Sequence, residues 1–492
     1  MSIIQKITSQ ISFDIGALPT KLFIGGKWRD GSTGKRLDVI DPSTGSVIAA
    51  VADASIDDAL EAVAAAYKAL PAWAATAPRR RSEILRRCFE LMIERKDKLA
   101  ELISLENGKA LGDAHGEVAY AAEFFRWFSE EAVRLNGEIS TAPSGANKII
   151  VQHQPIGVAV LVTPWNFPAA MATRKIAPAL AAGCTCVLKP ATETPLTAYA
   201  LAELYAEAGV PDGVVNVITT EKSGPVVSRM LHDRRVRKLS FTGSTEVGRK
   251  LLHEAADTVI SCSMELGGNA PFIVFDDADL DAAIEGAMVA KMRNGGEACT
   301  AANRFYVQDG IIEAFANKLA ERMGAMTVGA GYAKTTQCGP VINRSALERI
   351  SGLVADATRR GAKVLTGGKQ LDGDGFYFPP TVLIGVSAEA AITGEEIFGP
   401  VAALTPFKTE DEVIAAANDT EFGLISYVYT RDLARGLRVS EKLEAGMVGL
   451  NRGLVSDPAA PFGGVKQSGL GREGAHHGIL EFSETKYIAV TW

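Results

Sequence analysis

Apolar residues recur at every third or fourth position through much of residues 57–134, and charged residues lie between them. The repeat is carried by Ile84, Leu85, Cys88, Leu91, Met92, Leu99, Leu102 and Ile103. An α-helix places side chains at this spacing on one face, where they can be buried together. The pattern therefore predicts a layer of amphipathic helices near the start of the chain.

Short β-rich runs alternate with longer helical ones from Gly157 onward. The runs that predict strands are 157–162, 184–188, 214–218, 238–241 and 261–265. Helices are predicted between them at 171–182, 196–208, 224–231 and 245–256. This alternation is typical of a parallel sheet with helices on both faces, which binds ligands at the carboxyl ends of its strands.

A second α/β lobe is predicted after Gly267, because the alternation begins again there. It opens with a strand at 271–275, a helix at 280–292 and a strand at 305–308, and continues to about residue 461. At 492 residues the chain also exceeds the size at which a single hydrophobic core keeps growing. Pattern and length both indicate at least two lobes.

Two apolar strands have no sequence neighbour with which to pair. One covers residues 148–153, and the other lies in the C-terminal segment 481–492. Unpaired strand edges promote aggregation unless another strand covers them. We expect these strands to pair with each other and with another subunit, which predicts a homodimer or homotetramer.

Composition excludes several kinds of partner. The chain is 47% hydrophobic and 22% charged, and its net charge of −7 comes from interspersed acids and bases without basic blocks. Apolar runs are interrupted before they could cross a membrane, and no signal peptide is recognisable. The six cysteines and six histidines lack the paired spacing of metal ligands. We expect a cytoplasmic protein that binds no nucleic acid, membrane or metal ion.

Cys299 has the most distinctive surroundings of the cysteines. It ends the stretch Asn294-Gly-Gly-Glu-Ala-Cys299, in which two glycines let the backbone approach a ligand closely. A thiolate is an intrinsic nucleophile and suits covalent catalysis. A single cysteine is, however, more often a small buried hydrophobic residue. Taken alone, the residue leaves both interpretations open.

Seven ordered motifs change that balance. They are Thr163-Pro-Trp-Asn-Phe-Pro168, Leu188-Lys-Pro-Ala191, Phe241-Thr-Gly-Ser244, Met264-Glu-Leu-Gly-Gly268, Cys299, Glu396-Ile-Phe-Gly-Pro400 and Pro461-Phe-Gly-Gly-Val-Lys-Gln-Ser-Gly469. In order and spacing they resemble the aldehyde dehydrogenase family along nearly the full chain. The resemblance implies an α/β fold with a doubly wound parallel-sheet cofactor lobe, an α/β catalytic lobe and a small oligomerisation sheet.

The resemblance also implies a division into domains. Residues 1–133 and 156–266 would form the dinucleotide-binding domain, and residues 267–465 the catalytic domain. Residues 134–155 and 466–492 would be oligomerisation segments.

Three catalytic roles follow from the same resemblance. Cys299 would attack the aldehyde carbon, and the resulting alkoxide would accept hydrogen bonds from the Asn166 side chain and the Cys299 backbone N–H. Hydride transfer to NAD or NADP would leave a thioester, and Glu265 would activate the water that hydrolyses it. In isolation, Asn166 is equally typical of a turn and Glu265 of a turn cap.

The cofactor site departs from the commoner dinucleotide fingerprint, because no Gly-x-Gly-x-x-Gly follows the first strand. Instead, a strand turns into a helix at 241–248, and the first N–H groups of such a helix favour an anion. By resemblance, the cofactor-binding residues are Thr163, Trp165, Lys189, Thr192, Gly243, Ser244, Gly248, Glu396 and Phe398. Relatives that prefer NAD often have glutamate in place of Thr192, so we expect NADP to be accepted; the neighbouring Glu193 weighs against this.

A closer resemblance, to the succinate-semialdehyde dehydrogenase branch, implies a substrate that carries a carboxylate. That branch has arginines at the positions of Arg174 and Arg293, and a carboxylate-binding serine at Ser456. Two guanidinium groups suit a carboxylate, although any single arginine more often pairs with a surface acid.

Two departures and two alternatives remain. Ala301 occupies the position at which some members have a second cysteine, and this excludes a disulfide switch. Glu297 occupies the position at which many members have glutamine. Its carboxylate would either raise the pKa of Cys299 or restrict the substrate. The alternatives are another acid-bearing aldehyde, such as glutarate semialdehyde, and a catalytically silent structural member. A coenzyme-A-acylating relative is disfavoured, because such enzymes do not need Glu265.

Overall fold

The predicted helical layer forms the N-terminal part of the fold. The computed structural model describes residues 11–491, so the first ten residues of the predicted dinucleotide-binding domain and Trp492 lie outside it. The layer consists of α2 (Ile56–Ala74), α3 (Pro78–Glu94), α4 (Lys96–Asn107) and α5 (Leu111–Glu131). Ser55 begins α2 with a capping box, in which its side chain and that of Asp58 satisfy each other's backbone N–H groups.

The five strands predicted for the first lobe form one parallel sheet. They are β7 (Val158–Val162), β8 (Thr185–Lys189), β9 (Val215–Val217), β10 (Val236–Thr242) and β11 (Ser261–Glu265). The full strand order is β19-β11-β10-β7-β8-β9-β1-β2. The edges are completed by antiparallel pairing of β1 (Leu22–Ile24), β2 (Lys27–Arg29) and β19 (Gly469–Leu470). Strand β19 belongs to the segment predicted for oligomerisation, yet it joins this sheet.

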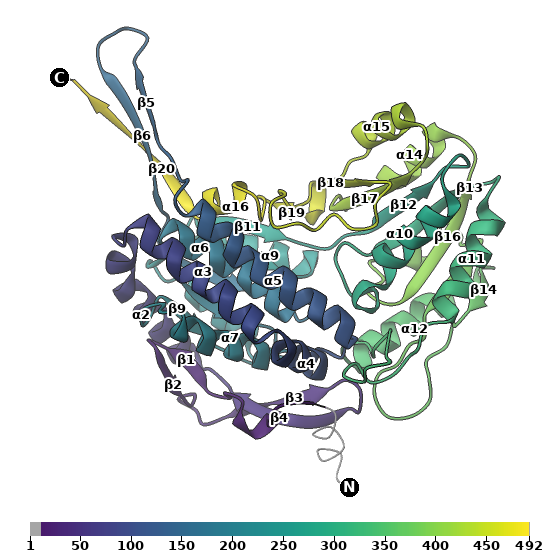
Figure 1. Cartoon of the computed structure of the whole chain (residues 1–492), viewed down its shortest axis with the longest axis horizontal. Coiled ribbons are helices and arrows are strands. Elements are labelled where there is room, and N and C mark those ends of the chain that lie inside the picture. Colours follow the sequence, from purple (N-terminus) through teal and green to yellow (C-terminus); the bar gives the residue numbers. More distant parts are fainter. Residues whose placement is uncertain (1–10, 492) are drawn as a thin grey trace.

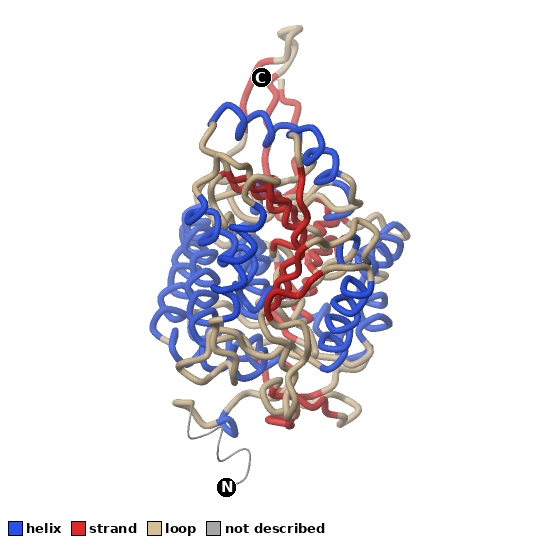
Figure 2. Tube along the Cα trace, turned by 90° about the vertical axis from the view of Figure 1, so that its right-hand side faces the viewer, coloured by secondary structure: helices blue, strands red, loops and turns tan. Residues whose placement is uncertain are grey.

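Helices cover both faces of this sheet (Figure 2). Those that follow the first four parallel strands are α6 (Pro168–Ala182), α7 (Pro195–Glu207), α8 (Ser223–Leu231) and α9 (Thr245–Ala256). Along β7, Ala159 and Leu161 join the core under α3 to α7, whereas Val158 and Val160 join the core under α2, α8 and α9. A strand buried on both faces must be apolar throughout, and β7 is.

The order of the parallel strands reverses at β7, whose neighbours are β8 on one side and β10 on the other. Such a switch point leaves a crevice outside the carboxyl ends of the two strands, because their following loops depart in opposite directions. The loops that leave β7 and β10 carry two of the seven motifs.

The second lobe contains a seven-stranded sheet in the order β14-β15-β16-β13-β12-β17-β18. Its strands are β12 (Ala270–Val274), β13 (Ala302–Gln308), β14 (Lys363–Thr366), β15 (Thr381–Ile384), β16 (Val401–Phe407), β17 (Ile425–Tyr429) and β18 (Met447–Leu450). Its helices are α10 (Leu280–Met292), α11 (Ile312–Gly324), α12 (Arg344–Arg359), α13 (Ala391–Gly394), α14 (Glu410–Asn418) and α15 (Leu433–Lys442). All neighbouring strands except β14 and β15 pair in parallel, which confirms the predicted second α/β lobe.

The two strands predicted to lack a sequence neighbour, at 148–153 and within 481–492, pair with each other, as predicted. Strand β6 (Lys148–Pro155) lies antiparallel to β20 (Ser483–Val490) along its whole length, and β5 (Glu138–Thr141) adds a third strand. This sheet projects from the body of the molecule (Figure 1). A separate hairpin is formed by β3 (Arg36–Asp41) and β4 (Ser46–Ala52), and the short α16 (His477–Leu480) precedes β20.

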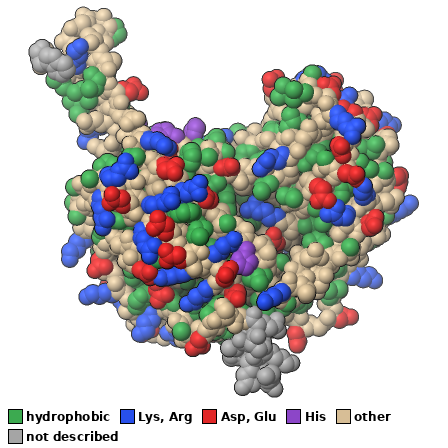
Figure 3. All heavy atoms as spheres, in the orientation of Figure 1, with side chains coloured by type: hydrophobic (Ala, Val, Ile, Leu, Met, Phe, Trp, Pro, Cys, Tyr) green, Lys and Arg blue, Asp and Glu red, His purple; other side chains and the backbone are tan. Residues whose placement is uncertain are grey.

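Charged side chains of both signs are intermixed on the face of the molecule seen in Figure 3. Within residues 11–491, no helix has the length and apolarity needed to cross a membrane. The same residues contain no cluster of histidine, cysteine and acidic side chains arranged to hold a metal ion.

Candidate active site

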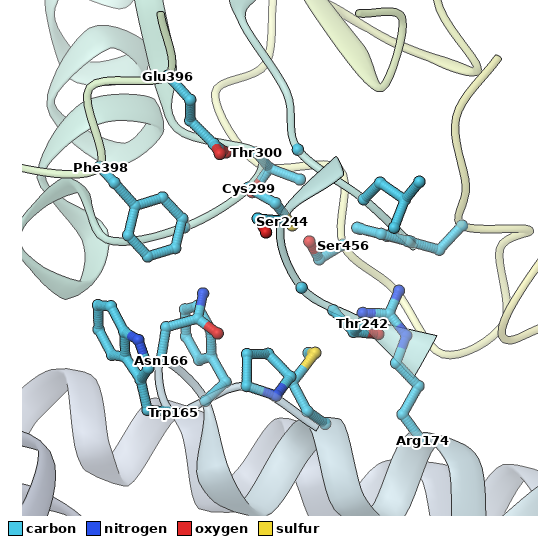
Figure 4. Close-up of a pocket in the computed structure, with 18 of the residues that line it drawn as sticks. Trp165, Asn166, Arg174, Thr242, Ser244, Cys299, Thr300, Glu396, Phe398 and Ser456 are labelled. Carbon is cyan, nitrogen blue, oxygen red and sulfur yellow. The ribbon is translucent and has the colours of Figure 1, made fainter. Parts of the chain in front are cut away.

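A cavity of about 360 Å³ lies between the two lobes. Its walls come from the loops after β7 and β10, the loop that carries Cys299, and the loops around Glu396 and Ser456. Ten predicted site residues line it: Trp165, Asn166, Arg174, Gly243, Ser244, Arg293, Cys299, Glu396, Phe398 and Ser456. Figure 4 shows all of them except Gly243 and Arg293, which it does not label, converging from separate segments of the chain.

The loop before Cys299 has a tightly turned backbone. Asn294, Gly295 and Gly296 follow one another with φ values of 55°, 58° and 80°, in the left-handed region that favours glycine. A Cβ on Gly296 would lie 2.2 Å from the carbonyl oxygen of Gly399. The two glycines therefore let this loop turn sharply and pack against the loop that carries Glu396.

The Asn166 side chain lies beside Cys299 in the cavity (Figure 4). Its Nδ2 donates one hydrogen bond to the backbone oxygen of Glu297, at 3.0 Å. An amide nitrogen carries two hydrogens, so one remains for a ligand. The Asn294 side chain donates to the backbone oxygens of both Asn166 and Glu297, which ties the two loops together.

Burial raises the pKa of the Cys299 thiol to about 12, and the negative charge of Glu396 adds to the effect. Arg174 and Arg293 act in the opposite direction. The carboxyl group of Glu297 accepts a hydrogen bond from the backbone N–H of Ile342, at 3.1 Å. Glu396 is therefore the acid that bears most on the thiol, and Glu297 instead holds the neighbouring backbone.

Glu265 ends β11, as predicted, and is buried next to the cavity rather than on its wall. Burial raises its pKa well above the usual range, and the charge of Glu473 raises it further. Arg174 and Lys175 lower it. A buried carboxyl with a raised pKa is a stronger base than an exposed one once it is ionised.

The residues predicted to hold a dinucleotide divide into two groups. Trp165 and Phe398 face each other across the cavity with ring centroids 5.3 Å apart and nearly perpendicular planes. Ser244 is the N-cap of α9, and its side chain accepts a hydrogen bond from the backbone N–H of Val247. The start of a twelve-residue helix thus opens on the cavity beside Gly243, which fits a ligand with phosphate groups.

Four predicted cofactor residues lie away from this cavity: Thr163, Lys189, Thr192 and Gly248. Burial lowers the pKa of Lys189 to about 8, and Glu193 opposes the shift. Thr192 lines a separate space of about 200 Å³ with Glu193 and Glu106, and its hydroxyl donates to Glu193. Gly248 faces Leu266, which leaves no room for a Cβ, so this glycine permits helix packing.

Arg174 and Arg293 enter the cavity from different lobes, as the sequence analysis expected. Arg174 lies on α6, and its Nε forms a buried ion pair with Glu473, at 2.7 Å between nitrogen and oxygen. Arg293 lies just after α10 and forms no ion pair with any residue in the described part of the chain. Arg174 is therefore partly neutralised by Glu473, an acid outside the predicted site residues. Arg293 has no such ion pair, although its charge opposes the rise that burial causes in the pKa of Asp113.

Two buried ion pairs near the site were missed by sequence reasoning. Lys175 Nζ donates to Glu473 at 2.6 Å, directly behind Arg174. Lys109 Nζ donates to Glu117 and to the backbone oxygen of Asn166, each at 2.6 Å. Charged residues in helices normally face solvent, so their spacing along the chain gave no sign that these were buried.

Comparison with known proteins agrees with this arrangement. The model of the aldehyde dehydrogenase family matches residues 28–488. A succinate-semialdehyde dehydrogenase of Paenarthrobacter nicotinovorans is 55% identical over 90% of this chain and 99% of its own. A glutarate-semialdehyde dehydrogenase of Pseudomonas putida is 52% identical over 95% of this chain and 97% of its own. The crystal structure of an Escherichia coli NADP-dependent enzyme, 49% identical, superimposes with a TM-score of 0.95 over 97% of this chain and 99% of that one.

The expected fold is thus confirmed at the level of the whole chain. Six of the seven motifs contribute residues to one cavity, and the similarity extends over nearly all of the sequence. The chain belongs to the aldehyde dehydrogenase family.

Proposed function

We propose that this enzyme oxidises succinate semialdehyde to succinate with NADP or NAD as hydride acceptor. The assignment of the substrate rests on the placement of Arg174 and Arg293 in one cavity with Cys299. A guanidinium that forms no ion pair in the described residues, in one cavity with a half-buried nucleophile, suits a substrate with an aldehyde at one end and a carboxylate at the other.

Cys299 attacks the aldehyde carbon, and its thiol proton passes to solvent water as the carbon–sulfur bond forms. The carbonyl oxygen becomes an alkoxide, which accepts hydrogen bonds from the free N–H of Asn166 and the backbone N–H of Cys299. Each donor of such an oxyanion hole typically contributes about a hundredfold or more to the rate. A bound nicotinamide would supply the hydride acceptor for the same carbon, and Cys299 would then hold a thioester.

Glu265 then takes a proton from the water that attacks the thioester. The carbon–sulfur bond breaks, the acid product leaves, and the Cys299 thiolate takes up the proton that Glu265 accepted. Because burial and Glu473 raise the pKa of Glu265, its carboxylate is a strong base for this step.

The cofactor is held by residues of both lobes. The start of α9, with Gly243 and Ser244, would bind the pyrophosphate. Glu396 would bind the nicotinamide ribose, and Lys189 and Thr192 would bind the adenosine ribose. Thr192 can donate to a 2′-phosphate, which favours NADP, and the nearby carboxylate of Glu193 opposes it. The Escherichia coli structure with a TM-score of 0.95 is titled an NADP-dependent enzyme, which supports NADP.

Glutarate semialdehyde is the second candidate substrate. The Pseudomonas putida relative that bears this name is almost as similar as the Paenarthrobacter one. The two substrates differ by one methylene, which changes binding by only about 1–3 kcal/mol. A catalytically silent role is disfavoured, because Cys299, Asn166 and Glu265 are all present.

We also propose a homodimer or homotetramer in the cytoplasm. The sheet of β5, β6 and β20 projects from the body with apolar side chains exposed, including Ile139 and Tyr487. A second subunit would cover such a sheet.

Initial rates test the substrate and cofactor together. We expect kcat/KM to be highest for succinate semialdehyde, lower for glutarate semialdehyde, and lower by about a hundredfold or more for butanal, which lacks the carboxylate. Each should be measured with NAD and with NADP. Equal kcat/KM for butanal and the semialdehydes would contradict the proposed substrate, and turnover with NAD alone would contradict the use of NADP.

A further inference from the structure

We infer that the hydroxyl group of Tyr120 is a further donor to the substrate's carboxylate, in addition to Arg174, Arg293 and Ser456. The inference rests on the proposed function and deepens it. Tyr120 was not among the residues that the sequence motifs single out. It lies in α5, which precedes all of those motifs in the sequence.

The placement of Tyr120 is the first argument. It lines the cavity together with Cys299 and both arginines. The guanidinium carbon of Arg293 lies 5.7 Å from the centre of its ring. One helical turn further, Phe124 packs against the Tyr120 ring at 4.9 Å and lies 5.6 Å from the guanidinium carbon of Arg174. The phenol therefore lies near both cations, and the charges of both oppose the rise that burial causes in its pKa.

The second argument is that donors at this end of the cavity have no partner. The Tyr120 hydroxyl is buried without a hydrogen bond to any residue of the range 11–491, and so is Nη2 of Arg174. A buried polar group without a partner typically costs about 1–3 kcal/mol, so most such groups are satisfied. A carboxylate offers two oxygens with about four lone-pair positions, enough for Tyr120 and both arginines.

The state of Arg174 explains why a further donor is needed. Its Nε is engaged with Glu473, and its guanidinium carbon lies 3.7 Å from the centre of the Phe462 ring, so its orientation is constrained. A guanidinium that shares its charge with a buried acid attracts a second carboxylate less strongly. A neutral phenol donates to the carboxylate without adding another charge to be desolvated. Burial raises the pKa of Tyr120, which keeps the hydroxyl protonated.

Tyr120→Phe removes only this hydroxyl, and Tyr205→Phe is its matched control. Tyr205 is also buried, and its hydroxyl likewise lacks a described partner, but it packs on Phe125 in the core and does not line the cavity. For each variant we would measure kcat/KM for succinate semialdehyde and for butanal. Thermal unfolding would show whether each variant is folded.

Binding is measured separately from activity. Calorimetry on the cofactor-free enzyme compares succinamate, which has a carboxylate at one end and an amide at the other, with the neutral succinamide. We expect Tyr120→Phe to weaken succinamate binding by about tenfold or more, and to lower kcat/KM for succinate semialdehyde by a similar factor. Succinamide binding, the rate with butanal, and every property of Tyr205→Phe should stay within about twofold of the unmodified enzyme.

The outcomes separate the two proposals. If the unmodified enzyme does not prefer the semialdehyde over butanal, the proposed function fails. If it does, but Tyr120→Phe binds succinamate as tightly as the unmodified enzyme, the role of Tyr120 alone is wrong. A loss that is equal for succinamate and succinamide would also overturn that role, because it would reflect cavity shape rather than recognition of charge.

Discussion

At the scale of single residues, the site contains a nucleophile and a base whose pKa values are both raised by burial. Burial keeps Cys299 protonated, with a pKa of about 12, and raises the pKa of Glu265 as well. Low polarity around both groups makes the thiolate and the carboxylate more reactive once they form. Arg174 stabilises both anions, since it lowers both pKa values.

Glu265→Gln should separate the two chemical stages. We expect the first turnover to release about one reduced cofactor per active site, because Cys299 and Asn166 are unchanged. Steady-state turnover should fall by about a hundredfold or more, because no base activates the hydrolytic water. Rapid-mixing absorbance at the reduced nicotinamide band measures both phases. Loss of the first phase would mean that Glu265 already acts before hydride transfer.

Glu396 and Glu297 should affect the nucleophile differently. In the cofactor-free enzyme at pH 9, Glu396, whose pKa is about 7, is ionised and raises the pKa of Cys299. Glu396→Gln should therefore speed alkylation of Cys299 by iodoacetamide, because more thiolate is present. Glu297→Gln should leave the rate unchanged, since its carboxyl contacts Ile342. A larger acceleration from Glu297→Gln would contradict this assignment.

At the scale of elements, α5 positions the loop that carries Asn166. One carboxylate oxygen of Glu117 accepts from Lys109, and the other accepts from the backbone N–H groups of Ala169 and Ala170 at the start of α6. Lys109 in turn donates to the backbone oxygen of Asn166. A fully buried ion pair thus joins α5, the loop after β7 and α6 into one unit.

Glu117→Leu should destabilise the fold by about 3–5 kcal/mol, because it leaves the Lys109 ammonium buried without a counter-charge. Urea unfolding measures the change. The double variant Lys109→Met with Glu117→Leu should recover part of the loss. Glu90→Leu, which breaks the exposed pair of Glu90 with Arg86, is the control and should cost about 1 kcal/mol or less. Equal costs for Glu117→Leu and Glu90→Leu would contradict this view.

At the scale of the whole molecule, two features depend on more than one part of the chain. The active-site cavity lies between lobes, so neither lobe alone contains a complete site. The sheet of β5, β6 and β20 extends beyond the body, and Ile139 on it is 73% exposed and Tyr487 58% exposed. Apolar side chains on a thin projecting sheet are typical of a surface that another subunit covers.

Ile139→Glu combined with Tyr487→Glu should therefore reduce the size of the assembly. We expect sedimentation at micromolar concentration to show a dimer or tetramer for the unmodified enzyme and a smaller species for this variant, since charge on a buried interface is costly. Leu433→Glu, at a side chain that is 67% exposed at the start of α15, should not change the assembly. A monomeric unmodified enzyme would rule out the proposed oligomer.

Local pattern alone was enough to predict the parallel strands and connecting helices of the first lobe. Strands β7 to β11 and helices α6 to α9 follow from the alternation of short β-rich runs with longer helical ones, which is a property of neighbouring positions. The motifs around Cys299, Asn166 and Glu265 were recognisable for the same reason, because each is a short run of residues.

The sequence by itself thus determined the elements, the family and the candidate chemistry. Only the tertiary structure decided which polar and charged groups share an environment: Glu473 beside Arg174, Lys109 beside Asn166, Glu396 rather than Glu297 at the thiol, and Tyr120 near both arginines. These partners are separated by many residues in the chain. Burial and distance in three dimensions set their electrostatic interactions, and neither can be read from the spacing of residues along the sequence.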